Sequence, residues 1–128
     1  MSDYAYPDVI ATTQWAGEHL QDPAVRFIEL GFSADSYDAG HIPGAVGWVW
    51  NGSVLQSGER EVIRKADLEV QLARAGVARE TTIVFYDGVG NLLAAMALWV
   101  LKIYGHPDVR LLDGERTKWT RENRPLAT

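Results

Sequence analysis

The 128-residue sequence contains no cysteine. This absence excludes disulfide bonds, catalysis by a thiolate and zinc sites built on cysteine sulfur. The sequence also has no excess of basic residues, because 12 lysines and arginines stand against 17 acidic residues, giving a net charge of −5. An acidic chain gains no attraction from a phosphate backbone, so nucleic acid is not expected as a partner.

Long apolar runs are missing as well. The longest, residues 92–101, is too short to span a bilayer and ends at Lys102. The first residues carry neither the basic nor the apolar segment of a signal peptide, so we expect a cytoplasmic protein with no membrane partner. A dinucleotide fingerprint would need a third glycine after Gly88 and Gly90, and the three histidines lack the spacing of a metal site. Neither a cofactor nor a metal is therefore expected.

The composition and length fit a single globular domain over residues 1–128, with an apolar fraction of 47%. Short runs typical of strands alternate with helical patterns. Strands are expected near 9–11, 25–30, 45–50, 82–86 and 109–112, helices over 14–20, 33–40, 67–75, 92–104 and after 114, and a polar loop over 51–61. This alternation with short links predicts an α/β fold, in which helices cover both faces of a parallel sheet.

Several residues carry signals for helix ends. Thr12 or Thr13 is expected to cap the first helix, and Asp67 the third. Gly76 suits the C-terminal end of that third helix. In the last helix, Trp119 is expected to pack inward.

The turn between the run 82–86 and the helix 92–104 is the main candidate site. Its members are Asp87, Gly88, Val89, Gly90, Asn91 and Leu92. A strand-to-helix turn of this kind lies at the carboxyl edge of a sheet, where free N–H groups and the helix dipole favour an anion. The Asp87 carboxylate can cap the helix and fill this cradle itself. Alternatively, it can act as a general base or nucleophile toward a small substrate.

His41, Arg60 and Trp50 are candidates for a pocket around this turn. His41 can pair with Asp87 in acid–base chemistry, or its ring can hold the turn over residues 41–44 by bonding to backbone groups. Arg60 is either a solvated loop charge or part of an anion pocket. Of Trp48 and Trp50, one is expected in the core, and the other, if exposed, would mark a binding surface.

Three separated motifs carry a family resemblance. They are YDAGHIPGA at residues 37–45, YGHPDVRLLDG at 104–114, and KW at 118–119 followed by RP at 124–125. With them, the chain resembles the rhodanese (thiosulfate sulfurtransferase) homology domain. It is most similar to the cysteine-less N-terminal domain of tandem-domain sulfurtransferases. The resemblance implies a rhodanese-like fold, a doubly wound five-stranded parallel sheet with helices on both faces.

The resemblance also assigns roles to positions. The family's catalytic cysteine, which carries sulfur as a persulfide, corresponds here to Asp87. An arginine five residues later helps to hold the sulfur donor, and its counterpart is Leu92. Val49 stands where tandem first domains often have an acidic residue, before the tryptophan that Trp50 matches. Arg60 matches a family arginine. Because Val49 and Leu92 replace polar residues, the pocket is expected to be less polar than in an active member.

A carboxylate cannot carry transferable sulfur, so the resemblance implies that the isolated chain is inactive by the family mechanism. We expect a structural, regulatory or protein-binding role in sulfur metabolism. A catalytic rhodanese domain, another protein or self-association would supply the partner. Two alternatives stay open. The chain can be the N-terminal half of a tandem thiosulfate sulfurtransferase whose active cysteine lies in a domain not present here. It can also be a repurposed enzyme that uses Asp87 and His41 on a small molecule.

Overall fold

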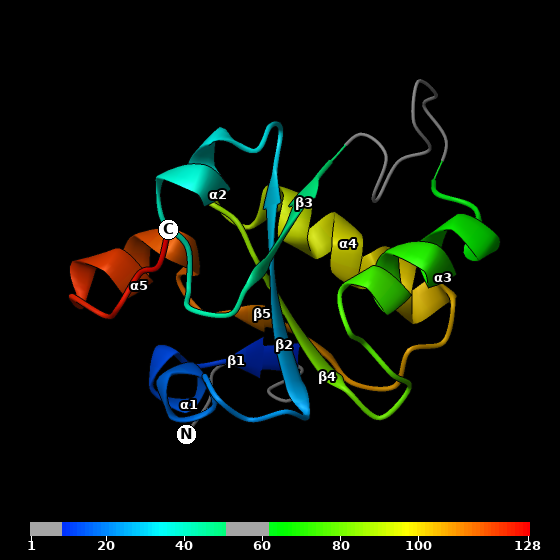
Figure 1. The fold of residues 1–128 in the computed structure, drawn as a ribbon, viewed down its shortest axis with the longest axis horizontal. Coiled ribbons are helices and arrows are strands. Elements are labelled where there is room, and N and C mark those ends of the chain that lie inside the picture. The colour runs from blue at the N-terminus through cyan, green and yellow to red at the C-terminus, as the bar shows by residue number, and fades with distance from the viewer. Residues whose placement is uncertain (1–8, 51–61) are drawn as a thin grey trace.

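The computed structural model describes residues 9–50 and 62–128, which form one five-stranded sheet in the order β1-β5-β4-β2-β3 (Figure 1). All four strand pairings are parallel. The strands are β1 Ile10–Ala11, β2 Val25–Gly31, β3 Val46–Val49, β4 Thr82–Tyr86 and β5 Val109–Leu112. The parallel sheet confirms the predicted α/β class.

Helices cover both faces of this sheet. Their bounds are α1 Thr13–Glu18, α2 Asp35–Ala39, α3 Lys65–Arg74, α4 Leu92–Ile103 and α5 Glu115–Arg121. Side chains from α3 and α4 pack into one core, and side chains from α1, α2 and α5 pack into the other. Within the described ranges, no helix is long and apolar enough to cross a membrane.

The central strand β4 shows why both faces need a cover. Ile83 and Phe85 belong to the core under α3 and α4, whereas Val84 and Tyr86 belong to the core under α1 and α5. All four side chains are fully buried. Successive side chains of a strand point to opposite faces, so an unbroken apolar run predicts a strand buried on both sides. The position of β4 in the middle of the sheet follows from that pattern.

The helix ends agree with the predictions in part. Thr12 caps α1 by accepting a hydrogen bond from the Trp15 amide at 3.0 Å. The prediction that Asp67 caps the third helix is wrong, because α3 begins at Lys65 and Arg64 occupies the cap position. Asp67 lies instead in the first turn, where its charge still interacts favourably with the helix dipole.

The other bounds differ by a few residues. The first helix ends at Glu18 and not at residue 20, and α4 ends at Ile103, one residue before the expected end. Gly76, with φ +75°, follows α3 as expected for a terminating glycine. The polar loop predicted over 51–61 lies outside the described residues.

The C-terminal residues fold back onto the domain. Ala127 and His41 exchange two backbone hydrogen bonds, at 2.8 and 2.7 Å. Trp119 is fully buried, as predicted, and its indole N–H donates to the Pro125 carbonyl oxygen at 2.8 Å. The tail therefore holds the loop at residues 41–44 against α5.

Candidate functional site

The loop over residues 87–91 leaves the central strand at the carboxyl edge of the sheet and leads directly into α4. Asp87 follows the last residue of β4, and Leu92 is the first residue of α4. Parallel sheets place ligands at this edge, so the loop has the location of an active site.

The Asp87 carboxylate fills the space inside this loop. Its Oδ1 accepts hydrogen bonds from the amides of Val89 and Asn91, at 2.8 and 2.7 Å. Its Oδ2 accepts from the amides of Leu93 and Ala94, at 2.9 and 3.0 Å. The residue is completely buried. This is the geometry that the helix-cap interpretation predicts, with both oxygens bonded to the backbone of the loop and the first turn of α4.

Asn91 gives the loop its shape. Its backbone is left-handed, with φ 61°, and Gly90 before it has φ 78°. Asparagine and glycine tolerate this region better than other residues. The Asn91 side chain accepts a hydrogen bond from the Asp87 amide at 3.2 Å and donates to the Leu112 carbonyl oxygen at 2.8 Å. The loop is thus tied to β5 as well as to its own carboxylate.

The outer surface of the loop is apolar. Val89 and Leu92 have 47% and 62% of their surface exposed. A hollow that includes Val89 is lined by Leu30, Gly31, Phe32, Ser33, Asp35, Ser36, Gly88, Val89 and Leu93. Among these described lining residues there is neither lysine nor arginine, so the hollow supplies no side-chain cation to an anionic ligand.

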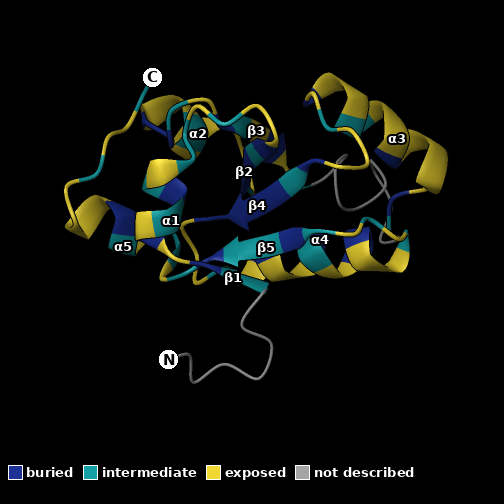
Figure 2. Cartoon of the chain, turned by 90° about the horizontal axis from the view of Figure 1, so that it is seen from below, coloured by how far each residue is buried: buried dark blue, intermediate teal, exposed yellow. Residues whose placement is uncertain are grey.

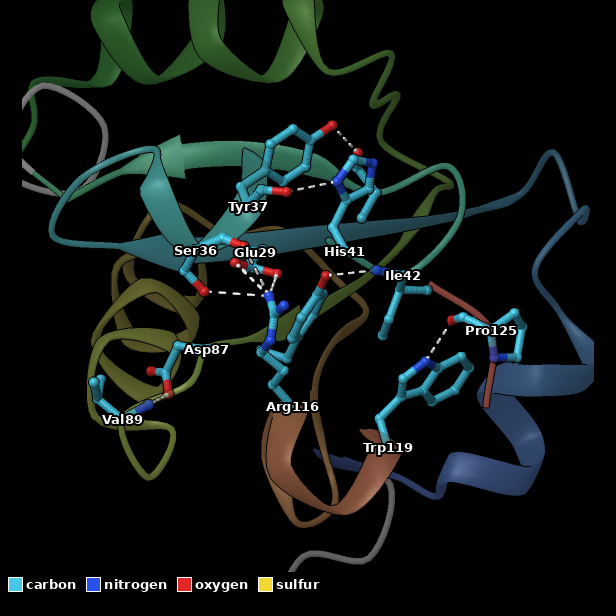
Figure 3. A network of polar contacts seen from close by, with 12 residues as sticks. Glu29, Ser36, Tyr37, His41, Ile42, Asp87, Val89, Arg116, Trp119 and Pro125 are labelled. Atoms are coloured by element: carbon cyan, nitrogen blue, oxygen red, sulfur yellow. Dashed lines mark hydrogen bonds and ion pairs between the residues drawn. The ribbon is translucent and has the colours of Figure 1, made fainter. Parts of the chain in front are cut away.

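A second hollow shares Ser36 and Gly88 with the first and includes Arg116 and Arg121. The Arg116 guanidinium is already engaged. Its Nη1 donates to the Glu29 carboxylate at 3.0 and 3.2 Å and to the Ser36 carbonyl oxygen at 3.1 Å (Figure 3). The backbone amide of Arg116 also donates to the Asp87 carbonyl oxygen at 3.0 Å. This arginine therefore fastens β2, α2 and the loop to the start of α5.

Glu29 and Arg116 were missed by reasoning from sequence. Glu29 is 2% exposed and lies between the buried apolar residues Ile28 and Leu30 of β2. An acidic residue between such neighbours is the signal that could have revealed a buried ion pair. The neighbouring Tyr86 hydroxyl accepts a hydrogen bond from the Ile42 amide at 3.1 Å. Burial raises the pKa of Tyr86, and the Glu29 charge raises it further, so the phenol stays neutral.

The His41 ring has a structural environment. It is 8% exposed and stacks on Tyr37, with ring centroids 3.8 Å apart and planes 3° from parallel. Its Nδ1 lies 2.9 Å from the Tyr37 carbonyl oxygen, which is a hydrogen-bond acceptor. Figure 3 shows that His41 and Asp87 point toward different partners. The structure does not bring these two residues together as an acid–base pair.

The remaining candidates are spread over the domain. Trp48 lies in the core, 5% exposed, as expected of one of the two tryptophans. Trp50 is half-buried and packs against the same core, so it does not form an exposed anchor. Arg60 lies outside the described residues. In the described part of the chain, no three histidine or acidic side chains are placed to hold a metal ion.

Comparison with known proteins agrees with this architecture. The family model of the rhodanese-like domain matches residues 12–122. The sulfur carrier protein TtuD of Thermus thermophilus is 42% identical over 125 residues, which are 98% of this chain and 44% of that protein. A protein of Mycolicibacterium smegmatis, provisionally named a thiosulfate sulfurtransferase, is 38% identical over 96% of this chain and 44% of its own length. The chain thus spans less than half the length of these relatives.

Solved structures show the same fold. The crystal structure of YnjE superposes with a TM-score of 0.84 at 26% identity, over 99% of this chain and 32% of that one. The crystal structure of SseA from Escherichia coli, a 3-mercaptopyruvate sulfotransferase, gives a TM-score of 0.81 at 24% identity, over 93% of this chain and 50% of that one. With the family model matching nearly the whole domain, the chain belongs to the family of rhodanese-like domains.

Proposed function

We propose that this chain is a non-catalytic rhodanese-like domain that acts in sulfur metabolism in the cytoplasm through binding to another protein. In this proposal, the loop that carries chemistry in active relatives is a structural element. The partner is a catalytic rhodanese domain, another protein or a second copy of this chain.

One observation carries the proposal, namely the position of the Asp87 carboxylate. Its two oxygens already accept four backbone N–H groups, and no part of it is exposed. A persulfide would need a thiolate in this place, and the sequence has no cysteine. The same bonds argue against acid–base chemistry, because a general base must reach the proton that it removes.

A second candidate function is favoured by the relatives. They are more than twice as long as the matched segment, as TtuD is matched over only 44% of its length. The chain can therefore represent the N-terminal half of a two-domain thiosulfate sulfurtransferase, with the sulfur-carrying cysteine supplied by the other half. In both cases this domain contributes binding or support and not the nucleophile.

Introducing a cysteine at position 87 tests whether the loop and its surroundings can still support sulfur transfer. Asp87→Cys is expected to give little thiosulfate sulfurtransferase activity, because Leu92 and the hollow beside it leave the negative donor uncompensated. Adding Leu92→Arg should raise the rate by about tenfold or more, since a charged hydrogen bond to the donor is restored. The measurement is sulfur transfer from thiosulfate, with each variant checked for folding by circular dichroism.

Asp22→Cys is the matched control, because it places a thiol at a partly exposed aspartate outside the loop. The unsubstituted chain and this control should both be inactive. Turnover by the unsubstituted chain would refute the non-catalytic proposal. High activity of Asp87→Cys without the arginine would instead show that the pocket keeps its affinity for the donor.

A further inference from the structure

The outer face of α4 carries a row of exposed large apolar side chains. Leu92, Met96, Trp99 and Ile103 have 62%, 37%, 53% and 54% of their surface exposed. The opposite face of the helix, with Leu93, Ala94, Ala97, Val100 and Leu101, is buried in the core. Figure 2 shows the exposed segments recurring along the side of α4 that faces away from the sheet. We call these four residues the α4 row.

Charge is nearly absent from this face. Within α4, all of which the structure describes, the other exposed residues are Ala95 and Lys102, and Lys102 is the one charge. The α3 helix, which covers the same side of the sheet, exposes charged residues in the usual way, among them Lys65, Asp67, Glu69 and Arg74. A helix that is apolar all round is normally covered on every side.

The spacing of the α4 row is that of a helix-pairing seam. Its members follow one another at intervals of four, three and four residues, which is the pattern of the a and d positions of a heptad. Side chains at such intervals form one stripe along a helix, and Ala95 beside the stripe allows a second backbone to approach. This pattern predicts that the occupant of the face is another helix.

We propose that the occupant is α4 of a second copy of this chain, packed antiparallel across a two-fold axis. The two-fold axis would cross α4 midway between Met96 and Trp99. Leu92 of one copy then faces Ile103 of the other, and Met96 faces Trp99, so each pair occurs twice. A two-fold contact requires a patch that is complementary to itself. The symmetric row satisfies this condition, and the pairing of Met96 with Trp99 places a thioether against an indole, a favourable contact.

The size of the patch sets the strength of the contact. Four side chains of this size and exposure present about 400 Å² of apolar surface, in the range of patches that mark interaction sites. With the flanking atoms, the two copies together would bury about 1,000 Å², at the low end for specific interfaces. A dissociation constant on the order of 10–100 μM is therefore expected.

Sedimentation velocity of the intact chain at concentrations from about 5 μM to about 500 μM tests the self-association. The mass should rise with concentration from 14.2 kDa toward twice that value. Trp99→Glu should keep the chain monomeric at every concentration, because dimer formation would bury two negatively charged glutamates close together near the two-fold axis. Val70→Glu is the matched control, since Val70 is 48% exposed on α3 and should leave the dimer intact. A mass that never rises, or dimers that survive Trp99→Glu, would overturn the proposal.

Cross-linking tests the antiparallel arrangement, and the cysteine-free sequence makes this experiment clean. A mixture of Leu92→Cys and Ile103→Cys chains, one of them carrying a purification tag, should form the mixed disulfide under mild oxidation. Each variant by itself should cross-link at least tenfold less, because the two positions lie about 16 Å apart along a helix and a disulfide joins Cα atoms within about 7 Å. Preferential disulfide formation between two Leu92→Cys chains would refute the antiparallel pairing. A chain that stays monomeric but binds a separately expressed catalytic rhodanese domain through the α4 row would assign the face to that partner and refute self-association.

Discussion

Asp87→Asn is expected to lower the melting temperature by roughly 10 °C, which corresponds to about 3 kcal/mol of unfolding free energy in a domain of this size. The carboxylate presents two acceptor oxygens to four amides inside a buried loop. An asparagine side chain keeps one acceptor and turns an N–H₂ group toward amides that are themselves donors. Two buried donors would then lose their partner, and the negative charge at the start of α4 would be lost as well.

Asp22→Asn is the control for this prediction. The Asp22 carboxylate accepts a hydrogen bond from the Ala24 amide at 2.9 Å in an exposed turn. Asparagine can make the same bond, so this variant should melt within about 2 °C of the unsubstituted chain. Thermal melts followed by circular dichroism measure both. If Asp87→Asn melts unchanged, the carboxylate is not the structural cap of the loop, and a chemical role for Asp87 would regain support.

The fold could be predicted from the sequence because its signals are local. The apolar run of β4 occupies consecutive positions, the apolar residues of β2 lie close together, and Gly90 and Asn91 mark a turn by their backbone preferences. The capping role of Asp87 is local in the same sense, since its partners lie between two and seven residues further along the chain. Pattern and spacing suffice where the interacting groups are close in sequence.

Other features depend on contacts that spacing does not encode. Glu29 and Arg116 are 87 residues apart and meet only because α5 begins beside Asp87 at the end of β4, from where the Arg116 side chain reaches β2. The start of α3 at Lys65 was missed because Asp67 is a good capping residue, and nothing nearby in the sequence shows that the helix forms one turn earlier. The exposure of the α4 row could not be predicted from the sequence, because a largely apolar helix does not reveal which of its faces the sheet covers.

Arg116→Met is the second variant with a large expected effect, a loss of roughly 3–5 kcal/mol of unfolding free energy. The Glu29 side chain is 1% exposed, and Arg116 provides its ion pair at 3.0 Å. Removing the guanidinium would leave an uncompensated carboxylate inside the domain. The neutral Tyr86 hydroxyl, which is hydrogen-bonded to Glu29, cannot replace a positive charge. Urea unfolding at neutral pH measures the loss directly.

A double-mutant cycle separates the ion pair from the packing of the arginine stem. Glu29→Gln in the Arg116→Met background should recover about 2 kcal/mol or more, because a neutral amide costs less to bury than an unpaired charge. Equal losses for Arg116→Met with and without Glu29→Gln would mean that Arg116 stabilises the domain through its stem and its backbone bond to Asp87. The Glu29 carboxylate would then contribute little to holding β2 against α5.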